Sequence, residues 1–162
     1  MDVVGLSKNG IENAVANLGT SLTDKQIFTL NQFFNDIIIC FDGDESGYKA
    51  ALRAAENSIR EMKPEKQISF LFLPDQEDPD SFVNKNGKEY FFDYSKQNKV
   101  SIHQFIFNHY KKNTQNNPSS MAIFEKKLRS IANTIKDSYI KKYVLEYFIE
   151  KISGLTPYTS QN

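Results

Sequence analysis

Two Asp-x-Asp pairs are the residues of this 162-residue chain best suited to chemistry. Each pair follows an apolar run typical of a buried strand, and these runs cover residues 37–41 and 68–73. The four carboxylates that share this position are Asp42, Asp44, Asp78 and Asp80. Carboxylate oxygens are the ligands that Mg²⁺ prefers, and this ion keeps waters and substrate phosphates as its other ligands. The pattern predicts a site for Mg²⁺, or Mn²⁺, against a phosphate.

The segment between the two pairs has the length and order of one βαβ unit. A helical pattern runs from Ser46 to about Met62, Pro64 interrupts it, and the second strand follows. Crossovers between parallel strands are right-handed almost without exception, so consecutive strands end at the same edge of the sheet. Ligands of open α/β sheets bind at that edge. We therefore expect all four carboxylates there, where two ions could stabilise the attacking and leaving oxygens of an in-line displacement.

The same aspartates have a purely structural interpretation, because Asp often caps turns and helices. Either pair alone fits that role, whereas two pairs at one sheet edge favour metal binding. The nearby glycines agree with a ligand site: Gly43 lets the backbone turn without a side chain, and Gly47 leaves room for a phosphate at the next helix start.

Elements before the first pair continue the alternation of helix and strand. The pattern predicts a helix over residues 2–9 ending at Gly10, then a short strand over residues 14–18. Thr23 and Gln26 form a capping box that begins a second helix. This alternation is typical of an α/β fold with a mostly parallel sheet and flanking helices.

Beyond about residue 97 the strand pattern ends and a helical region begins. Helical spacing of apolar residues covers 102–110, 121–135 and 139–152. Ser119 or Ser120 is the expected cap of the second of these helices. The aromatic stripe of the third predicts core packing rather than a cofactor pocket.

These patterns divide the chain into a first domain over residues 1–97, a small all-α subdomain over 98–155 and a flexible tail over 156–162.

Composition excludes several classes of function. The 20 basic and 20 acidic residues balance, which argues against a chain that coats nucleic acid electrostatically. The longest apolar run falls far short of the roughly 20 residues that span a membrane, so we expect a cytoplasmic protein without membrane contact. Cys40 is the single cysteine, so no internal disulfide forms. His103 and His109 lack a Cys or His companion at metal-ligand spacing, so no zinc site is expected.

Three stretches taken together resemble bacterial replicative DNA primases. They are Phe-Asp-Gly-Asp-x-x-Gly-x-x-Ala-Ala over 41–51, Phe-Leu-Pro-Asp-x-Glu-Asp-Pro-Asp-Ser-Phe-Val over 72–83, and the opening Met-Asp-Val-Val-x-Leu. The resemblance covers nearly all of residues 1–97 and implies the TOPRIM catalytic fold that primases share with topoisomerases. The later helices are similar to the helical subdomain of a primase polymerase core.

The resemblance implies DNA-directed synthesis of short RNA primers from ribonucleoside triphosphates, a nucleotidyl transfer that depends on positioning and charge neutralisation. It places Asp42 and Asp44 on the family's central metal-binding pair and Asp78 and Asp80 on its second acidic motif. Asp2 falls on the aspartate of a Glu-Gly-Tyr-Met-Asp motif. All five are implied metal ligands, and Asp42, Asp44 and Asp78 are the implied catalytic residues. The implied partners are a single-stranded DNA template, ribonucleoside triphosphates and, through regions absent here, the replicative helicase of a nucleoid-associated replisome.

The chain departs from the family pattern in three places. Glu45-Ser46 stands where a basic residue and Ala are usual, and Gln76 replaces a common Gly. The chain also begins at the Met of the Glu-Gly-Tyr-Met-Asp motif, so we expect a fragment that lacks the motif's glutamate and its strand. Such a fragment is expected to be inactive alone and to expose an unpaired sheet edge that favours self-association. The alternatives are a TOPRIM nuclease or topoisomerase-like phosphodiesterase, and a non-catalytic TOPRIM binding module.

Overall fold

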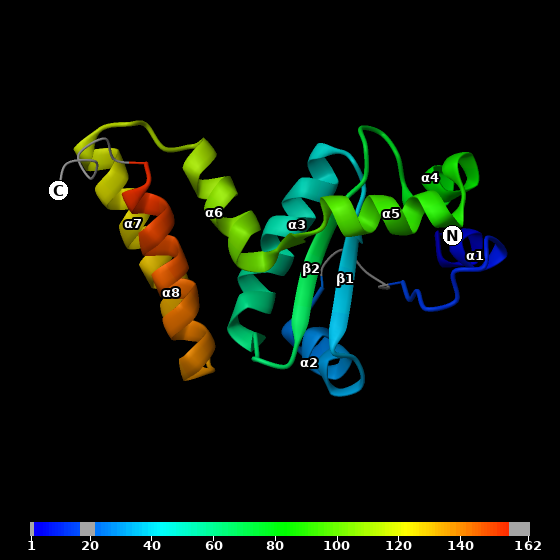
Figure 1. Ribbon diagram of the computed structural model, residues 1–162, viewed down its shortest axis with the longest axis horizontal. Helices are drawn as coiled ribbons and strands as arrows, with labels where there is room; N and C mark the ends of the chain where they lie inside the picture. The colour runs from blue at the N-terminus through cyan, green and yellow to red at the C-terminus, as the bar shows by residue number, and fades with distance from the viewer. Residues whose placement is uncertain (1, 17–21, 156–162) are drawn as a thin grey trace.

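The computed structural model describes residues 2–16 and 22–155, apart from the side chain of Asp2. At its centre, strands β1 (Asp36–Phe41) and β2 (Gln67–Phe72) pair in parallel along their whole length. A further backbone hydrogen bond of 3.1 Å from Leu73 N to Phe41 O extends the pairing past β2. Both predicted strands are confirmed, and their carboxyl ends lie at one edge of the sheet (Figure 1).

A third, two-residue strand makes the described sheet mixed. β3 (Val100–Ser101) pairs with β2 in the antiparallel sense, in the order β1-β2-β3. The prediction that strands end near residue 97 is therefore wrong, because two residues are too short to give a periodic pattern. The strand expected over 14–18 is absent from residues 14–16, and residues 17 and 18 lie outside the described part.

Helices cover both faces of the sheet. α3 (Glu45–Ser58) joins β1 to β2 and continues as the short 3-10 helix η1 (Ile59–Glu61). Its buried alanines, chiefly Ala51 and Ala55, let it approach the sheet closely, because they favour helix and carry little bulk. α4 (Pro79–Asn86) and α5 (Lys88–Asn98) follow β2, and Figure 1 shows α5 crossing the sheet on the side opposite α3.

The first two helices follow the sequence pattern. α1 (Asp2–Lys8) ends next to Gly10, whose φ of 79° is the left-handed conformation expected of a glycine stop. α2 (Asp24–Phe33) begins with the predicted capping box. In it the Thr23 side chain accepts from the backbone N–H of Gln26, and the Gln26 side chain accepts from the backbone N–H of Thr23.

The three predicted helices of the C-terminal region are confirmed. α6 (Ile102–Lys112), α7 (Pro118–Asn133) and α8 (Ser138–Ser153) extend the predicted ranges by a few residues, except that α7 ends earlier. The cap of α7 is Asn117, whose side chain accepts from the backbone N–H of Ser120, and not Ser119 or Ser120 as predicted.

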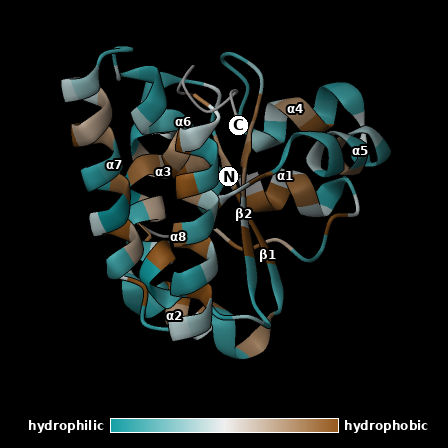
Figure 2. Cartoon of the chain, turned by 60° about the vertical axis from the view of Figure 1, so that its left-hand side comes forward, coloured by the Kyte–Doolittle hydropathy of each residue, from teal (hydrophilic) through white to brown (hydrophobic). Residues whose placement is uncertain are grey.

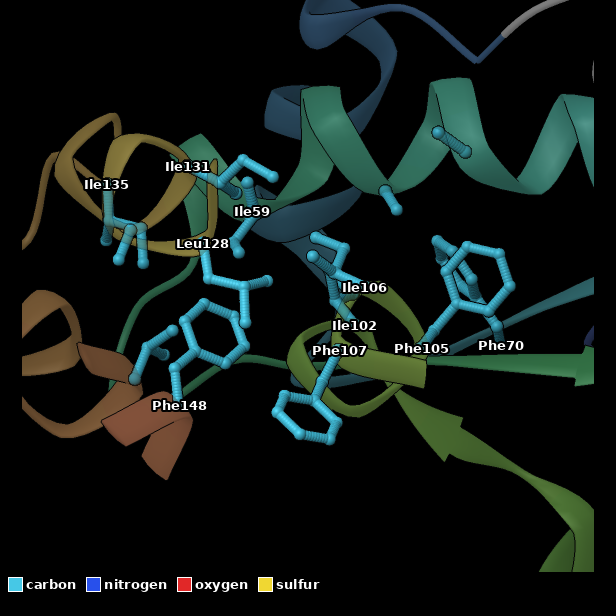
Figure 3. Close-up of a cluster of buried hydrophobic side chains, with 14 of the residues drawn as sticks. Ile59, Phe70, Ile102, Phe105, Ile106, Phe107, Leu128, Ile131, Ile135 and Phe148 are labelled. Carbon is cyan, nitrogen blue, oxygen red and sulfur yellow. The ribbon is translucent and has the colours of Figure 1, made fainter. Parts of the chain in front are cut away.

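One large core joins the sheet to these helices, with α6 at the junction. In Figure 3, Phe105 of α6 lies beside Phe70 of β2, while Phe107 points toward α8 and its Phe148. A much smaller cluster, formed by Leu6, Ile11 and Val83, packs α1 against α4. Figure 2 shows hydrophobic and hydrophilic colours along each of α3, α7 and α8, as expected of helices with one buried face.

β1 lies at an edge of the described sheet. Ile38 at its centre is 41% exposed, and Phe33 and Phe34 just before it are exposed as well. Apolar residues beside an unpaired strand edge favour self-association. No helix in the described part of the chain is long and apolar enough to cross a membrane.

Candidate metal-binding edge of the sheet

The first acidic turn, residues 42–44, connects β1 to α3. Asp44 is the N-cap of α3, and its Oδ1 accepts a hydrogen bond of 2.6 Å from the backbone N–H of Gly47. The side chains of Asp42 and Asp44 are exposed. The structural role considered for these aspartates is thus present at Asp44, and it uses one of the two carboxylate oxygens.

The second acidic turn, residues 74–78, is built in the same way between β2 and α4. Asp78 is the N-cap of α4, and its Oδ1 accepts a hydrogen bond of 2.7 Å from the backbone N–H of Ser81. The Ser81 hydroxyl accepts in return from the backbone N–H of Asp78 at 3.0 Å. Pro79 is the first residue of α4, where its missing N–H costs no helical hydrogen bond.

Two backbone hydrogen bonds join the turns to each other. The N–H of Gly43 donates to the carbonyl of Glu77 at 3.2 Å, and the N–H of Gln76 donates to the carbonyl of Gly43 at 3.1 Å. Gln76 has a φ of 61°, a left-handed conformation that is unusual for a residue other than glycine. The structure thus brings the Asp42–Asp44 turn and the turn that ends at Asp78 side by side.

Two glycines allow this close packing. A Cβ on Gly43 would lie 1.9 Å from the carbonyl oxygen of Pro74, far inside van der Waals contact. A Cβ on Gly47 would lie 2.3 Å from the carbonyl oxygen of Asp42. The backbone carbonyl of Asp42 therefore occupies the space beside Gly47 in which we expected a phosphate.

Asp80 has a different environment from the other three aspartates. It is half-buried between α4 and α1, and its Oδ1 would lie 1.7 Å from a Cβ on Gly5. The same oxygen accepts a hydrogen bond of 2.8 Å from the side-chain amide of Asn84. Asn84 in turn accepts at 2.8 Å from the side-chain amide of Asn9. Asp80 thus takes part in the α1–α4 contact, while the side chain of Asp2 lies outside the described residues.

At this edge, neighbouring groups lower the pKa of Glu77. The Ser81 hydroxyl donates to Glu77 at 2.6 Å, and this hydrogen bond, with the ammonium of Lys85 at 3.0 Å, lowers the pKa of Glu77. The N-termini of α3 and α4 both lie at this edge, and their dipoles stabilise negative charge nearby. Glu77 is a charged residue of the site that the strand and turn pattern did not single out.

The donor set fits Mg²⁺ or Mn²⁺ by its chemistry. Asp44 and Asp78 each have a carboxylate oxygen besides the one that caps a helix, and Mg²⁺ usually takes only one or two protein carboxylates. Within residues 2–16 and 22–155, no three His, Cys, Asp or Glu side chains lie close enough together to hold a metal ion. The described carboxylates therefore suit an ion that completes its coordination with waters and phosphate oxygens.

An aromatic pair beside the first acidic turn was not predicted. The hydroxyl of Tyr48 and Nδ1 of His109 are 2.9 Å apart and hydrogen-bonded, although 61 positions separate the two residues. No local pattern could reveal this pair, because it depends on how α6 packs against α3.

Comparisons with known proteins connect this geometry to one family. The model of the Toprim domain matches residues 1–72. A DNA primase of Pasteurella multocida (strain Pm70) is 45% identical over 107 residues, which cover 66% of this chain and 18% of that protein. The chain thus spans about a fifth of that curated relative.

Solved structures extend the match to the helical region. The structure of the DnaG catalytic core has a TM-score of 0.89 and 34% identity, over 96% of this chain and 50% of the other. A DnaG primase catalytic domain bound to ssDNA has a TM-score of 0.86 and 34% identity, over 92% of this chain and 48% of the other. The described fold, including α6 to α8, is therefore similar to half of a primase catalytic core.

Proposed function

The chain belongs to the bacterial DNA primase family, and we propose that it supplies the metal-binding part of a polymerase that makes RNA primers for DNA replication. In this proposal residues 1–97 form the TOPRIM domain and residues 98–155 the helical subdomain. The relatives and structures described above are primases, which favours this function over a nuclease, a phosphodiesterase or a non-catalytic module.

The proposal assigns the chemistry to the two acidic turns. Asp42, Asp44 and Asp78 would hold Mg²⁺ or Mn²⁺, with Asp80 of α4 and Asp2 of α1 as further ligands. When bound, such ions neutralise the charge that develops on the phosphates during in-line transfer of a nucleotide. The contribution of the chain itself is to fix the carboxylates, which it does through the caps of α3 and α4.

One observation carries this proposal: the pair of backbone hydrogen bonds between Gly43 and the second acidic turn. Because they join backbone atoms, they hold the turns together whatever the rotamers of the aspartates. A site for two ions needs such fixed spacing, since both ions must contact the same transferring phosphate.

We also propose that this polypeptide alone does not complete the reaction. The chain matches about half of each solved primase catalytic core described above, which supports this part of the proposal. The DNA template, the ribonucleoside triphosphates and the replicative helicase are the proposed partners of the whole protein, and the cytoplasm is its proposed location.

Paramagnetic Mn²⁺ tests the metal site directly. In amide NMR spectra of the ¹⁵N-labelled chain, we expect substoichiometric Mn²⁺ to broaden the resonances of both acidic turns. Asp44→Asn keeps a capping side chain but removes the charge, so it should weaken this broadening. Asp93→Asn is the matched control, because Asp93 is an exposed aspartate of α5 remote from the turns in sequence. If Asp44→Asn left the Mn²⁺ broadening unchanged, the assignment of Asp44 as a metal ligand would be contradicted.

A primer-synthesis assay tests the second part of the proposal. With a single-stranded DNA template, ribonucleoside triphosphates and Mg²⁺, the chain alone should make no RNA. RNA production by the chain, abolished by Asp42→Asn, would show that it is already a complete polymerase.

A further inference from the structure

Tyr48 lies in the first turn of α3, directly after the first acidic turn. It lies four residues after Asp44, and its backbone N–H donates to the Asp44 carbonyl at 3.1 Å. Residues four apart share a face of a helix, and helical side chains lean toward the N-terminus. The Tyr48 side chain therefore leans toward the end of α3 at which Asp44 is the cap.

The Tyr48 ring has contacts on two sides, yet the residue remains 37% exposed. Its hydroxyl is hydrogen-bonded to Nδ1 of His109 at 2.9 Å. Its ring centroid lies 5.9 Å from that of Phe72 and 5.4 Å from that of Phe105. These contacts hold the ring at one orientation, at a site where an unsupported tyrosine would rotate freely in solvent.

The rings beneath Tyr48 connect it to the strands that carry the aspartates. Phe72 ends β2 and stacks on Phe41, which ends β1, with centroids 5.6 Å apart. Phe72 also stacks on the buried Phe105 of α6 at 5.4 Å. Tyr48 is thus the outermost ring of a packed aromatic series that begins at the carboxyl ends of both strands.

We propose that the exposed part of the Tyr48 ring is a stacking surface for a nucleobase whose phosphate lies at the acidic turns. His109 is then a positioning residue that holds the ring in place. The inference rests on the proposed function and adds a base-contacting element to that site. Stacking suits this location because it needs no positive charge, and every base offers an aromatic face.

Two exposed tyrosines of α8 lack this combination. Tyr139 and Tyr143 are 72% and 62% exposed, but they lie on α8, which carries neither acidic turn. Tyr139 therefore serves as a matched control for the loss of an exposed tyrosine.

Photochemical cross-linking tests the contact itself. The full chain with Mg²⁺ is irradiated with an oligothymidylate of about 12 nucleotides that contains 5-iodouracil, a length within the range of single-strand sites. In a separate arm, 5-iodo-UTP replaces the oligonucleotide. We expect cross-linking at Tyr48, within the tryptic peptide of residues 26–49. The arm that reacts shows whether the base belongs to a strand or to a free nucleotide.

Affinity and NMR measurements test whether the contact is stacking. Tyr48→Ala should weaken binding of the labelled probe about tenfold, as expected for loss of one base–aromatic stack, while Tyr139→Ala should leave it unchanged. In the wild type, the protons of the bound base should shift upfield through the ring current. Tyr48→Phe keeps the ring but loses its hydrogen bond to His109, so Tyr48→Phe and His109→Ala should both reduce that shift without abolishing binding. A merely structural role for His109 would leave the shift intact.

Several outcomes would overturn the inference. They are cross-linking only outside residues 26–49, no cross-linking with either probe, or equal affinity of the Tyr48→Ala variant and the wild type. Each leaves the proposed function standing if Mn²⁺ still broadens the acidic turns. Absence of both the cross-link and the Mn²⁺ effect would remove the proposed function together with the inference.

Discussion

The two acidic turns have the same local construction but are supported by different cores. In each, a parallel strand ends and an aspartate caps the following helix, with Asp44 at α3 and Asp78 at α4. α3 packs into the large core with the sheet and α6, whereas α4 packs with α1 through a cluster of three buried residues. Local sequence thus sets the shape of each turn, while the packing of distant residues sets how firmly the turn is held.

The difference between the two cores should determine which part of the molecule unfolds locally first. Regions with few buried apolar contacts open at lower free energy than the main core. We therefore expect α1 and α4 to exchange their amide hydrogens faster than α3, although the capping hydrogen bonds at Asp44 and Asp78 are alike, at 2.6 and 2.7 Å.

Removal of an aromatic ring from the large core should have the largest effect on stability. Phe70 is completely buried, and Phe70→Ala should lower the free energy of unfolding by about 3–5 kcal/mol. Val83→Ala in the small cluster should cost less and should mainly speed hydrogen exchange in α1 and α4. Urea unfolding and amide exchange measure the two effects. Equal global losses from both variants would show that the clusters form one cooperative unit.

A methyl group added between the two acidic turns should have the next largest effect on stability. Gly43→Ala places its Cβ against the Pro74 carbonyl, so the two turns must separate, and we expect a loss of about 1–3 kcal/mol. Gly154→Ala at the end of α8 is the control, because its Cβ would meet the nearest atom at an ordinary 3.6 Å. Thermal unfolding compares the variants. A neutral Gly43→Ala would mean that the turns are not in contact.

Loss of either helix cap should lower stability by a smaller amount than Gly43→Ala. Asp44→Ala and Asp78→Ala should each lower stability by about 1 kcal/mol, and the Asn variants by little, because Asn caps as well as Asp does. The comparison of the turns predicts that the Asp78 variant affects only α4 and α1, while the Asp44 variant affects the whole fold. Residue-resolved hydrogen exchange decides this, and identical exchange patterns would contradict it.

The smallest predicted effect is a pH dependence of stability from a half-buried histidine, His103. Burial lowers the pKa of His103 from its ordinary 6.5, and its Nδ1 has no hydrogen-bond partner. The unfolded chain then binds the proton more readily, so stability should fall as pH drops below about 6.5. Burial also lowers the pKa of His109, which adds in the same direction. Urea midpoints between pH 7.5 and 5.5, values that bracket the ordinary histidine pKa, should fall less for His103→Gln than for the wild type.

Much of the fold follows from short-range patterns in the sequence. β1, β2 and the cap of α2 at Thr23 agree with their predictions because apolar runs and capping residues act locally. The sequence also predicts that the two turns lie close together, because a right-handed crossover places the ends of consecutive parallel strands at the same edge of the sheet. The roles of Asp42, Asp44 and Asp78 as metal ligands remain predictions.

The features that the sequence did not reveal depend on contacts between distant residues. β3 is recognisable only from its pairing with β2. The use of Asp80 in the α1–α4 contact depends on how closely Gly5 approaches it, and the Tyr48–His109 pair depends on the position of α6. In each case the local residues are compatible with several environments, and tertiary packing selects one.

The reciprocal hydrogen bonds at Gly43 have a consequence for the motions of this edge. Its N–H and its C=O are both engaged by the neighbouring turn, so neither bond can lengthen much unless the other does. Exchange of the amides of Gly43 and Gln76 should therefore follow a single opening event with one shared rate of closing. A ligand that holds either aspartate turn would slow both amides together, which makes this pair a built-in reporter of occupancy.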